Sequence, residues 1–403
     1  MSAPAAKTRG KSPVIRLTEE QGASLMRGAL GVAAVGIVLA VAAAIVDRER
    51  FAPAYLTGFV FVTTIGLGGL FFVLIQHLTR AGWSVGPRRQ MEWLSGILPV
   101  SAALFLPVAV LAHDLYREWM GPEAANDEVL RGKAAYLNPT FFYIRAVVFL
   151  AAWTGLALWF WRTSRKQDES GDPALTVKMQ LSSAPCVVVF GLTLTFAAFD
   201  WLMSLDPHWY STIFGVYIFA GSATSSLATL ALMTLALQSA GIMGKVSTVE
   251  HRHDIGKLLF GFIVFWAYIG FSQFILIWYA NIPEETIFYL HRLEGSWKTV
   301  SLTLLFGHFV IPFIVLLSRH AKRHPVVLGV AAVWMVVMHY VDIYWLVMPN
   351  FLHEEPSLSW IDLAGLLGPL GIGALAVVLR ARRSPAYPLR DPRLVEAMHV
   401  ENL

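Results

Sequence analysis

Ionisable side chains occur inside stretches of this sequence that are otherwise apolar, and they are the residues best suited to chemistry. Asp200 lies in FGLTLTFAAFDW and Arg145 in FYIRAVVFLAAW. An ionisable residue in a membrane-spanning helix is costly, so each marks a function or a structural partnership. At about 1.5 Å of rise per residue, both lie about 6–7 Å inside the same end of consecutive spans. They predict either a structural ion pair or a site that handles protons or a quinone head group.

A second group lies further along the chain, with His308 in LLFGHFVIPFIVLL and with His339, Asp342 and Tyr344 in HYVDIYWLVMP. His339 and Asp342 are three residues apart and share a helix face. An imidazole beside a carboxylate suits a proton relay. His308 and His339 lie about 12–15 Å from the same end of their spans, so we expect them to face each other. A hydrogen-bonded histidine network and the axial ligation of a b-type haem both stay open.

Weaker candidates accompany these two groups. His113 and Asp114 end another apolar run and either extend the Asp200 group or face water at the interface. Hydroxyl groups follow one face of a single span, where they either bond to their own helix or line a polar path to the inner side. These residues are Ser222, Ser225, Ser226 and Thr229. Gln76 and His77, at the inner end of another span, suggest a similar path.

The elements that position these residues are membrane-spanning helices. Hydrophobic residues make up 56% of the 403 residues and charged residues 14%, and the mean hydropathy is +0.58, which is a membrane composition. A helix needs about 20 apolar residues to cross a bilayer. Ten such runs are present, over residues 27–46, 54–78, 95–114, 140–162, 183–204, 211–238, 255–281, 298–320, 325–348 and 358–381.

These runs predict an all-α integral membrane protein. The membrane domain covers residues 26–381, between a polar segment 1–25 and a tail 382–403. Spans two to five and six to nine form two candidate four-helix bundles, with the first and last spans outside them. We expect no cleaved signal peptide.

Basic residues gather on the side of the membrane that holds both termini. By the positive-inside rule both termini are cytoplasmic, and in a bacterium the opposite side is the periplasm. The formal charge of +4 is therefore a topology signal, and nucleic-acid binding is not needed to explain it. Cys186 is the only cysteine, which excludes an internal disulfide, a cysteine-ligated iron–sulfur cluster and covalent haem attachment.

On the periplasmic side, Asp206-Pro207 predicts a tight turn after the fifth span. Asp206, His208 and Trp209 are candidate contacts to a partner protein there. The sequence has no H-E-x-x-H motif, phosphate loop or nucleophile elbow. We therefore expect neither a catalytic residue nor a metal ligand on this chain.

Four stretches resemble one family of membrane proteins. They are DWLMSLDPHWYSTIFGVYIFAG (200–221), FSQFILIWYANIPEET (271–286), HFVIPFIVLLSR (308–319) and YWLVMP (344–349). They look like the second quinone-binding-type membrane subunit of alternative complex III, a bacterial quinol:cytochrome c oxidoreductase. That subunit is NrfD/PsrC-like.

The resemblance implies ten helices, in two four-helix bundles flanked by the first and last spans, and no cofactor bound by this chain apart from quinone or quinol. Haems and iron–sulfur clusters would lie on partner subunits. These are a second NrfD-like polytopic subunit, multihaem and monohaem cytochrome c subunits and an iron–sulfur subunit, with a terminal oxidase as a further electron acceptor.

The expected function is that of an integral inner-membrane subunit that supports quinol oxidation and translocates protons through its acids and histidines. Two alternatives from other classes stay open. One is a secondary transporter with an intramembrane solute site, and the other is a haem b protein.

Overall fold

The computed structural model describes residues 15–352 and 355–402, and in these ranges every regular element is a helix. Ten helical segments are long and apolar enough to cross a membrane, which confirms the ten predicted spans. They are α1 (Glu19–Val46), α2 (Arg48–Leu78), α3 with α4 (Val85–Leu94 and Ile97–Val110), α8 (Pro139–Ser170), α9 (Ala174–Trp201), α10 (Phe214–Ser239), α11 (Val249–Ala280), α13–η4–α14 (Trp297–Thr303, Leu304–Val310 and Ile311–Leu317), α16 (Pro325–Val347) and α17 (Trp360–Arg383).

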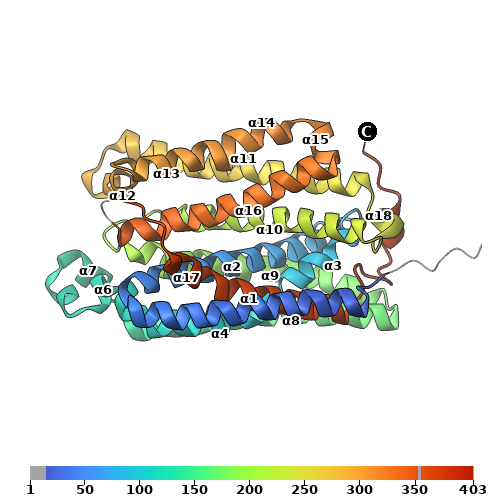
Figure 1. Cartoon of the computed structure of the whole chain (residues 1–403), viewed down its shortest axis with the longest axis horizontal. Helices are drawn as coiled ribbons and strands as arrows, with labels where there is room; N and C mark the ends of the chain where they lie inside the picture. The colour runs from blue at the N-terminus through green and yellow to red at the C-terminus, as the bar shows by residue number, and fades with distance from the viewer. Residues whose placement is uncertain (1–14, 353–354, 403) are drawn as a thin grey trace, which may run out of the picture.

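The spans run side by side along the long axis of the molecule (Figure 1). Both ends of the described chain lie at one end of the molecule, which we call the terminal end. It carries η3 (Gly244–Val246), α15 (Arg319–Arg323) and α18 (Leu394–Met398). The opposite, distal end carries α5 (Ala112–Leu115), α6 (Arg117–Met120), η1 (Pro122–Asn126), α7 (Glu128–Lys133), η2 (Met203–Leu205), α12 (Pro283–Leu293) and η5 (Met348–Asn350). Most of the predicted segment 1–25 lies outside the described residues.

Local signals set the helix ends. Thr18 and Ser359 each close a capping box at the start of α1 and α17, which satisfies backbone N–H groups that have no partner inside the helix. At the start of α8 the side chain of Asn138 accepts from the backbone N–H of Phe141 (2.9 Å), just before Pro139 at the first helical position. At its other end α8 stops at Gly171, whose φ of 71° is the left-handed conformation that favours glycine.

Helix α2 is the centre of the molecule, because most of its apolar stretch is buried inside the protein. It packs against α10, α17, α9, α4 and α16. By contrast, most of α1 is exposed and packs mainly on α17. A methyl group on Gly36 of α1 would overlap the backbone of Gly368 in α17, so small residues allow these two helices to touch.

Gly68 of α2 lies directly against α10. A methyl group there would overlap the carbonyl of Ser222 and the hydroxyl of Ser226. We expect Gly68→Val to push α2 and α10 apart and to lower the thermal unfolding temperature of the detergent-solubilised protein, because overpacking typically costs about 1–3 kcal/mol. Gly191→Val is the matched control, since no atom lies within 4 Å of the added group. Equal unfolding temperatures for the two variants would contradict this close contact.

Candidate functional site

The centre of the candidate site is the carboxyl group of Asp342 in α16. The hydroxyl of Tyr217 in α10 donates to its Oδ1 (2.5 Å), and the indole N–H of Trp266 in α11 donates to its Oδ2 (3.1 Å). Asp342 is only 1% exposed. Among the described residues, no arginine, lysine or histidine nitrogen lies within 4.0 Å of this carboxyl group. Asp342 is therefore a buried acid held by neutral donors, without a cation to fix its charge.

His339 lies one turn before Asp342 and connects α16 to α2. The hydroxyl of Thr64 donates to the carbonyl of Val60 (2.8 Å), so its oxygen accepts from the Nε2–H of His339 (2.8 Å). This arrangement of protons leaves Nδ1 of His339 as a buried acceptor with no partner. His339 can therefore take up a proton at Nδ1 without losing its bond to Thr64.

His308 lies in η4, a π-helical segment that interrupts the eighth span. Pro312, four residues later, has no N–H to bond to the His308 carbonyl and its ring crowds that carbonyl, which explains the local widening. In the same segment, the carbonyl of Gly307 accepts from the indole N–H of Trp334 in α16 (2.6 Å). The His308 ring packs on Trp266 with 3.9 Å between ring centroids. Neither of its nitrogens has a partner.

The His308 ring and the Asp342 carboxyl group thus share Trp266 as a common neighbour. The segment η4, which carries His308, packs against α16, which carries His339, so the two histidines lie on neighbouring helical segments. The arrangement combines one acid, one tyrosine hydroxyl and two imidazoles that can each accept a proton. It suits the storage and transfer of protons.

The surroundings of His339 do not fit a haem. A methyl group on Gly221 of α10 would lie 3.3 Å from Nδ1 of His339 and 3.5 Å from Oδ2 of Asp342, so α10 covers that side of the ring. Thr64 covers the Nε2 side. Neither nitrogen of His339 has room for a porphyrin iron. This packing therefore does not support the hypothesis that His308 and His339 are the axial ligands of a haem.

The Asp200–Arg145 pair forms as its depth predicts. Asp200 Oδ2 accepts from Nε of Arg145 (2.6 Å) and Oδ1 accepts from Nη2 (3.0 Å). Arg145 also donates to the carbonyl of Tyr136 (2.9 Å) and packs over the rings of Tyr136 and Phe141. Both oxygens of the carboxylate and all three nitrogens of the guanidinium are engaged. This geometry supports the structural reading, in which the pair joins α8 to α9.

His113, Asp114 and Tyr344 do not join either cluster. Asp114 accepts from Nε of Arg48 (2.8 Å) at the exposed distal end of α2. His113 and Asp114 border a surface hollow there, of about 950 Å³. The hydroxyl of Tyr344 donates to the carbonyl of Ser357 (3.1 Å). Tyr344 is two residues from Asp342 and thus points to another side of α16, which corrects its grouping with His339 and Asp342.

The hydroxyl groups of α10 bond to their own helix. The residues Ser222, Ser225, Ser226 and Thr229 each donate to a backbone carbonyl three or four residues earlier. This geometry supports the first of the two predicted alternatives, in which the hydroxyl groups bond to their own helix and do not line a polar path. At the terminal end of α2, Gln76 and His77 are buried, and the His77 ring packs against Phe160. Gln76 Oε1 and His77 Nε2 have no partner, so these two residues keep free hydrogen-bonding capacity.

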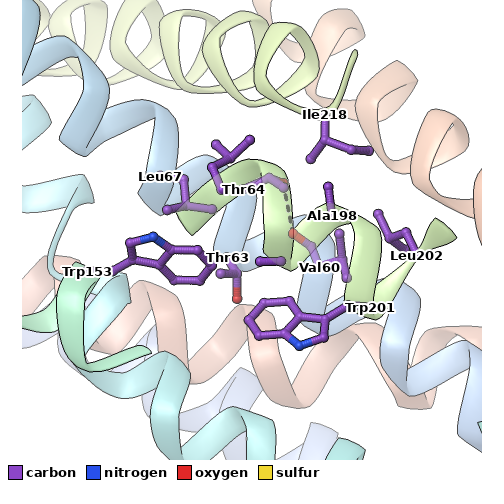
Figure 2. Close-up of a pocket in the computed structure, with 11 residues that line it drawn as sticks. Val60, Thr63, Thr64, Leu67, Trp153, Ala198, Trp201, Leu202 and Ile218 are labelled. Carbon is purple, nitrogen blue, oxygen red and sulfur yellow. Dashed lines mark hydrogen bonds between the residues drawn. The ribbon is translucent and has the colours of Figure 1, made fainter. Parts of the chain in front are cut away.

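A small cavity lies beside Thr64, between residues of α2, α8, α9 and α10. Its volume is about 20 Å³, space for about one water molecule. Figure 2 shows Thr63 and Thr64 of α2 facing Trp153 and Trp201 across it. The remaining lining is apolar, and it comprises Val60, Leu67, Leu194, Ala197, Ala198, Leu202 and Ile218.

Trp209 is not a surface contact in this chain, which corrects the prediction for this residue. It is 2% exposed and stacks on Phe288 of α12 at 4.0 Å between centroids. His208 is exposed and bonds to Asp127 Oδ2 (2.8 Å), at the start of α7. Asp206 is partly exposed in the same turn. Asp206 and His208 therefore remain available at the distal surface, whereas Trp209 anchors the turn from inside.

The contact between Asp127 and His208 predicts a local acid sensitivity. The backbone N–H of Leu130 and then His208 hold the pKa of the Asp127 carboxyl below its ordinary 3.8. A depressed carboxyl pKa stabilises the fold above the ordinary value and loses that effect as the pH falls through the depressed value. We expect pepsin to cut residues 121–138 slowly at pH 4.5 and faster at pH 2.5. Asp127→Ala lacks this carboxyl group, so its rate of cleavage should differ less between the two pH values than that of Glu123→Ala, which keeps it. The same pH response in both variants would contradict this role.

Two buried charged groups were not predicted from the sequence. At the distal end, burial lowers the pKa of Arg292 in α12 to about 9. Its guanidinium donates to three backbone carbonyls, including those of Trp345 (3.2 Å) and Leu346 (3.0 Å) of α16. Arg292 thus ties α12 to the end of the helix that carries Asp342. Arg292 lies in a short amphipathic segment outside the spans, so an intramembrane position does not distinguish it in the sequence.

The second group is at the terminal end, on α3. Arg88 pairs with Asp391, and Arg89 pairs with Asp168 (2.6 Å) and approaches Glu92 (3.3 Å). All five side chains are buried or nearly so. The R-R-x-x-E spacing at residues 88–92 was the available signal, because it predicts pairs on one helix face. The tail after Arg383 is therefore a packed part of the fold.

No protein-family model and no curated protein matches this chain.

Proposed function

We propose that this chain is an integral membrane subunit of a respiratory quinol:cytochrome c oxidoreductase of the alternative complex III type, and that its own task is to move protons. The observation that carries the proposal is the buried Asp342, held by Tyr217 and Trp266 beside two histidines with free nitrogens. Buried acids without a counter-ion are expensive in a membrane and mark function. The motif resemblance of residues 200–221, 271–286, 308–319 and 344–349 supplies the reaction class.

A second set of hydrogen-bonded polar groups lies about two turns of α11 beyond Trp266, toward the distal end, and supports proton exchange between Asp342 and that end. Tyr217 binds Asp342, and Gln273 of α11 donates to the hydroxyl of Tyr289 (3.1 Å). Ser211, in the turn before α10, donates to Gln273 (3.0 Å). Burial raises the pKa of Tyr289 to about 12, so its hydroxyl stays protonated and can donate. In this proposal protons pass between Asp342 and the distal surface along these groups.

The remaining parts of the proposal concern the surroundings of the chain. The membrane is the bacterial inner membrane, both termini are cytoplasmic and the distal end faces the periplasm, as the distribution of basic residues favours. Haems and iron–sulfur clusters belong to partner subunits, and the periplasmic surface around Asp206 and His208 is where a cytochrome-bearing partner would contact this chain. The ten helices divide into two four-helix bundles, α2–α9 and α10–α16, with α1 and α17 outside them, and the packing of α1 on α17 supports that division.

Isolation of the protein from its native membrane tests the proposal. We expect it to co-purify with c-type cytochromes and an iron–sulfur protein, and we expect the assembly to reduce cytochrome c with quinol. A stable lone chain whose thermal stability rises with one solute would contradict the proposal and favour a secondary transporter.

A further inference from the structure

A groove on the membrane-facing side lies between α4, α8 and α17, far from Asp342 in the fold. Its volume is about 230 Å³. Its floor is formed by Gly96, Pro99 and Val100, where α4 begins. Its walls are Leu158 and Trp161 of α8 on one side and residues 372–383 of α17 on the other. Helices α8 and α17 both pack on α4, and the groove is the space between them.

The length of the groove matches one acyl chain. From Ile372 to Arg383, α17 advances about 16 Å at about 1.5 Å per residue. That is about half the roughly 30 Å thickness of the hydrocarbon core, or one leaflet. The inner part of the lining is aliphatic, with Val100, Leu158, Leu375 and Leu379. The groove therefore offers an apolar track that runs from the terminal end to the middle of the bilayer.

At the terminal end of this track, unpartnered cationic and N–H groups gather. Arg380 is 6% exposed; its Nη1 donates to Ser95 (2.9 Å) and to the Glu92 carbonyl, whereas its Nη2 has no partner. Its guanidinium lies 4.8 Å from the ring centre of Trp161, whose indole N–H is also buried and unpartnered. Arg383 is exposed at the mouth and, among the described residues, has neither a hydrogen-bond nor an ion-pair partner.

Gly96 allows this arrangement. A methyl group there would lie 2.8 Å from Cδ and 2.9 Å from Nε of Arg380. The missing side chain lets Arg380 lie flat against the start of α4 and reach the groove.

We propose that this groove binds one anionic phospholipid of the leaflet at the terminal end. One acyl chain lies along Val100, Leu158, Leu375 and Leu379. The phosphate accepts from Arg383 and from the free N–H groups of Arg380 and Trp161. Basic pockets between membrane helices bind anionic head groups by this chemistry.

Native mass spectrometry of the detergent-purified full chain tests the proposal, with phosphatidylglycerol and phosphatidylcholine as probes. We expect one retained phosphatidylglycerol and weaker binding of phosphatidylcholine. Arg383→Gln should weaken phosphatidylglycerol binding by about fivefold, the effect of one cation near an anionic lipid. Trp161→Phe, which keeps the ring and the net charge, should also weaken it.

Arg382→Gln is the matched control. Arg382 carries the same charge one residue away, but its side chain lies on Gly22 of α1 and does not line the groove. We expect its affinity for phosphatidylglycerol to equal that of the unmodified protein. Equal binding of the two lipids, or equal weakening by Arg382→Gln and Arg383→Gln, would overturn the proposal and indicate a diffuse basic surface.

Discussion

Asp342→Asn is expected to stop proton translocation while the protein still assembles. Asparagine has nearly the shape of aspartate and keeps an oxygen that accepts from Tyr217 or Trp266, but it cannot bind and release a proton. Removal of a positioned proton-transfer group typically costs about 10²–10⁴ in rate. The measurement is the number of protons moved per quinol oxidised by the complex in sealed vesicles.

Asp172→Asn is the control for Asp342→Asn. It makes the same chemical change in the exposed turn between α8 and α9 and should leave the proton number unchanged. His339→Gln should slow translocation less than Asp342→Asn, because His308 remains beside Trp266 as a second acceptor. If the assembled Asp342→Asn complex moved the normal number of protons per quinol, Asp342 would have no role in translocation.

The second large effect concerns stability. Asp200→Leu should lower the free energy of unfolding by about 3–5 kcal/mol, because it leaves the Arg145 guanidinium buried without its carboxylate. The double variant Arg145→Leu/Asp200→Leu should recover most of this loss, since replacing both members of a buried pair by apolar groups is often neutral. Chemical denaturation in detergent, followed by helical circular dichroism, measures both.

The exposed pair between Arg393 and Glu396 (2.6 Å) is the matched comparison for the buried pair. Glu396→Ala should cost no more than about 1 kcal/mol, because solvent screens the pair. A double variant of Arg145 and Asp200 that is no more stable than Asp200→Leu would show that the pair does more than neutralise a buried charge.

The spans could be predicted from the sequence because hydropathy is a local property. The ends of the spans could not be predicted in this way, because capping and tertiary contacts extend several helices beyond the apolar runs. The helix α8 continues to Ser170 and α3 begins at Val85, so both extend into polar segments. The terminal-end pairs of Arg88 and Arg89 stabilise that extension with residues more than 70 positions away.

The candidate site was predicted only where depth alone decides a contact. Asp200 and Arg145 are on consecutive antiparallel helices, so matched depth was enough. Asp342 required partners from α10 and α11, and hydropathy does not show which distant helices become neighbours. The prediction that Trp209 contacts a partner protein was wrong for the same reason. An exposed aromatic residue at a membrane interface and one stacked under α12 look alike in a sequence.

The glycine contact on α2 also bears on how the molecule can move. Thr64, which binds His339, is one helical turn from Gly68, where α2 and α10 are too close for any side chain. Alternating access in a transporter requires one group of helices to rock against the other, but interdigitated backbones resist sliding and separation. His339 is thus bonded to α2 one helical turn from a close helix–helix contact. Proton movement there would proceed by rotation of side chains within a fixed frame, without a hinge.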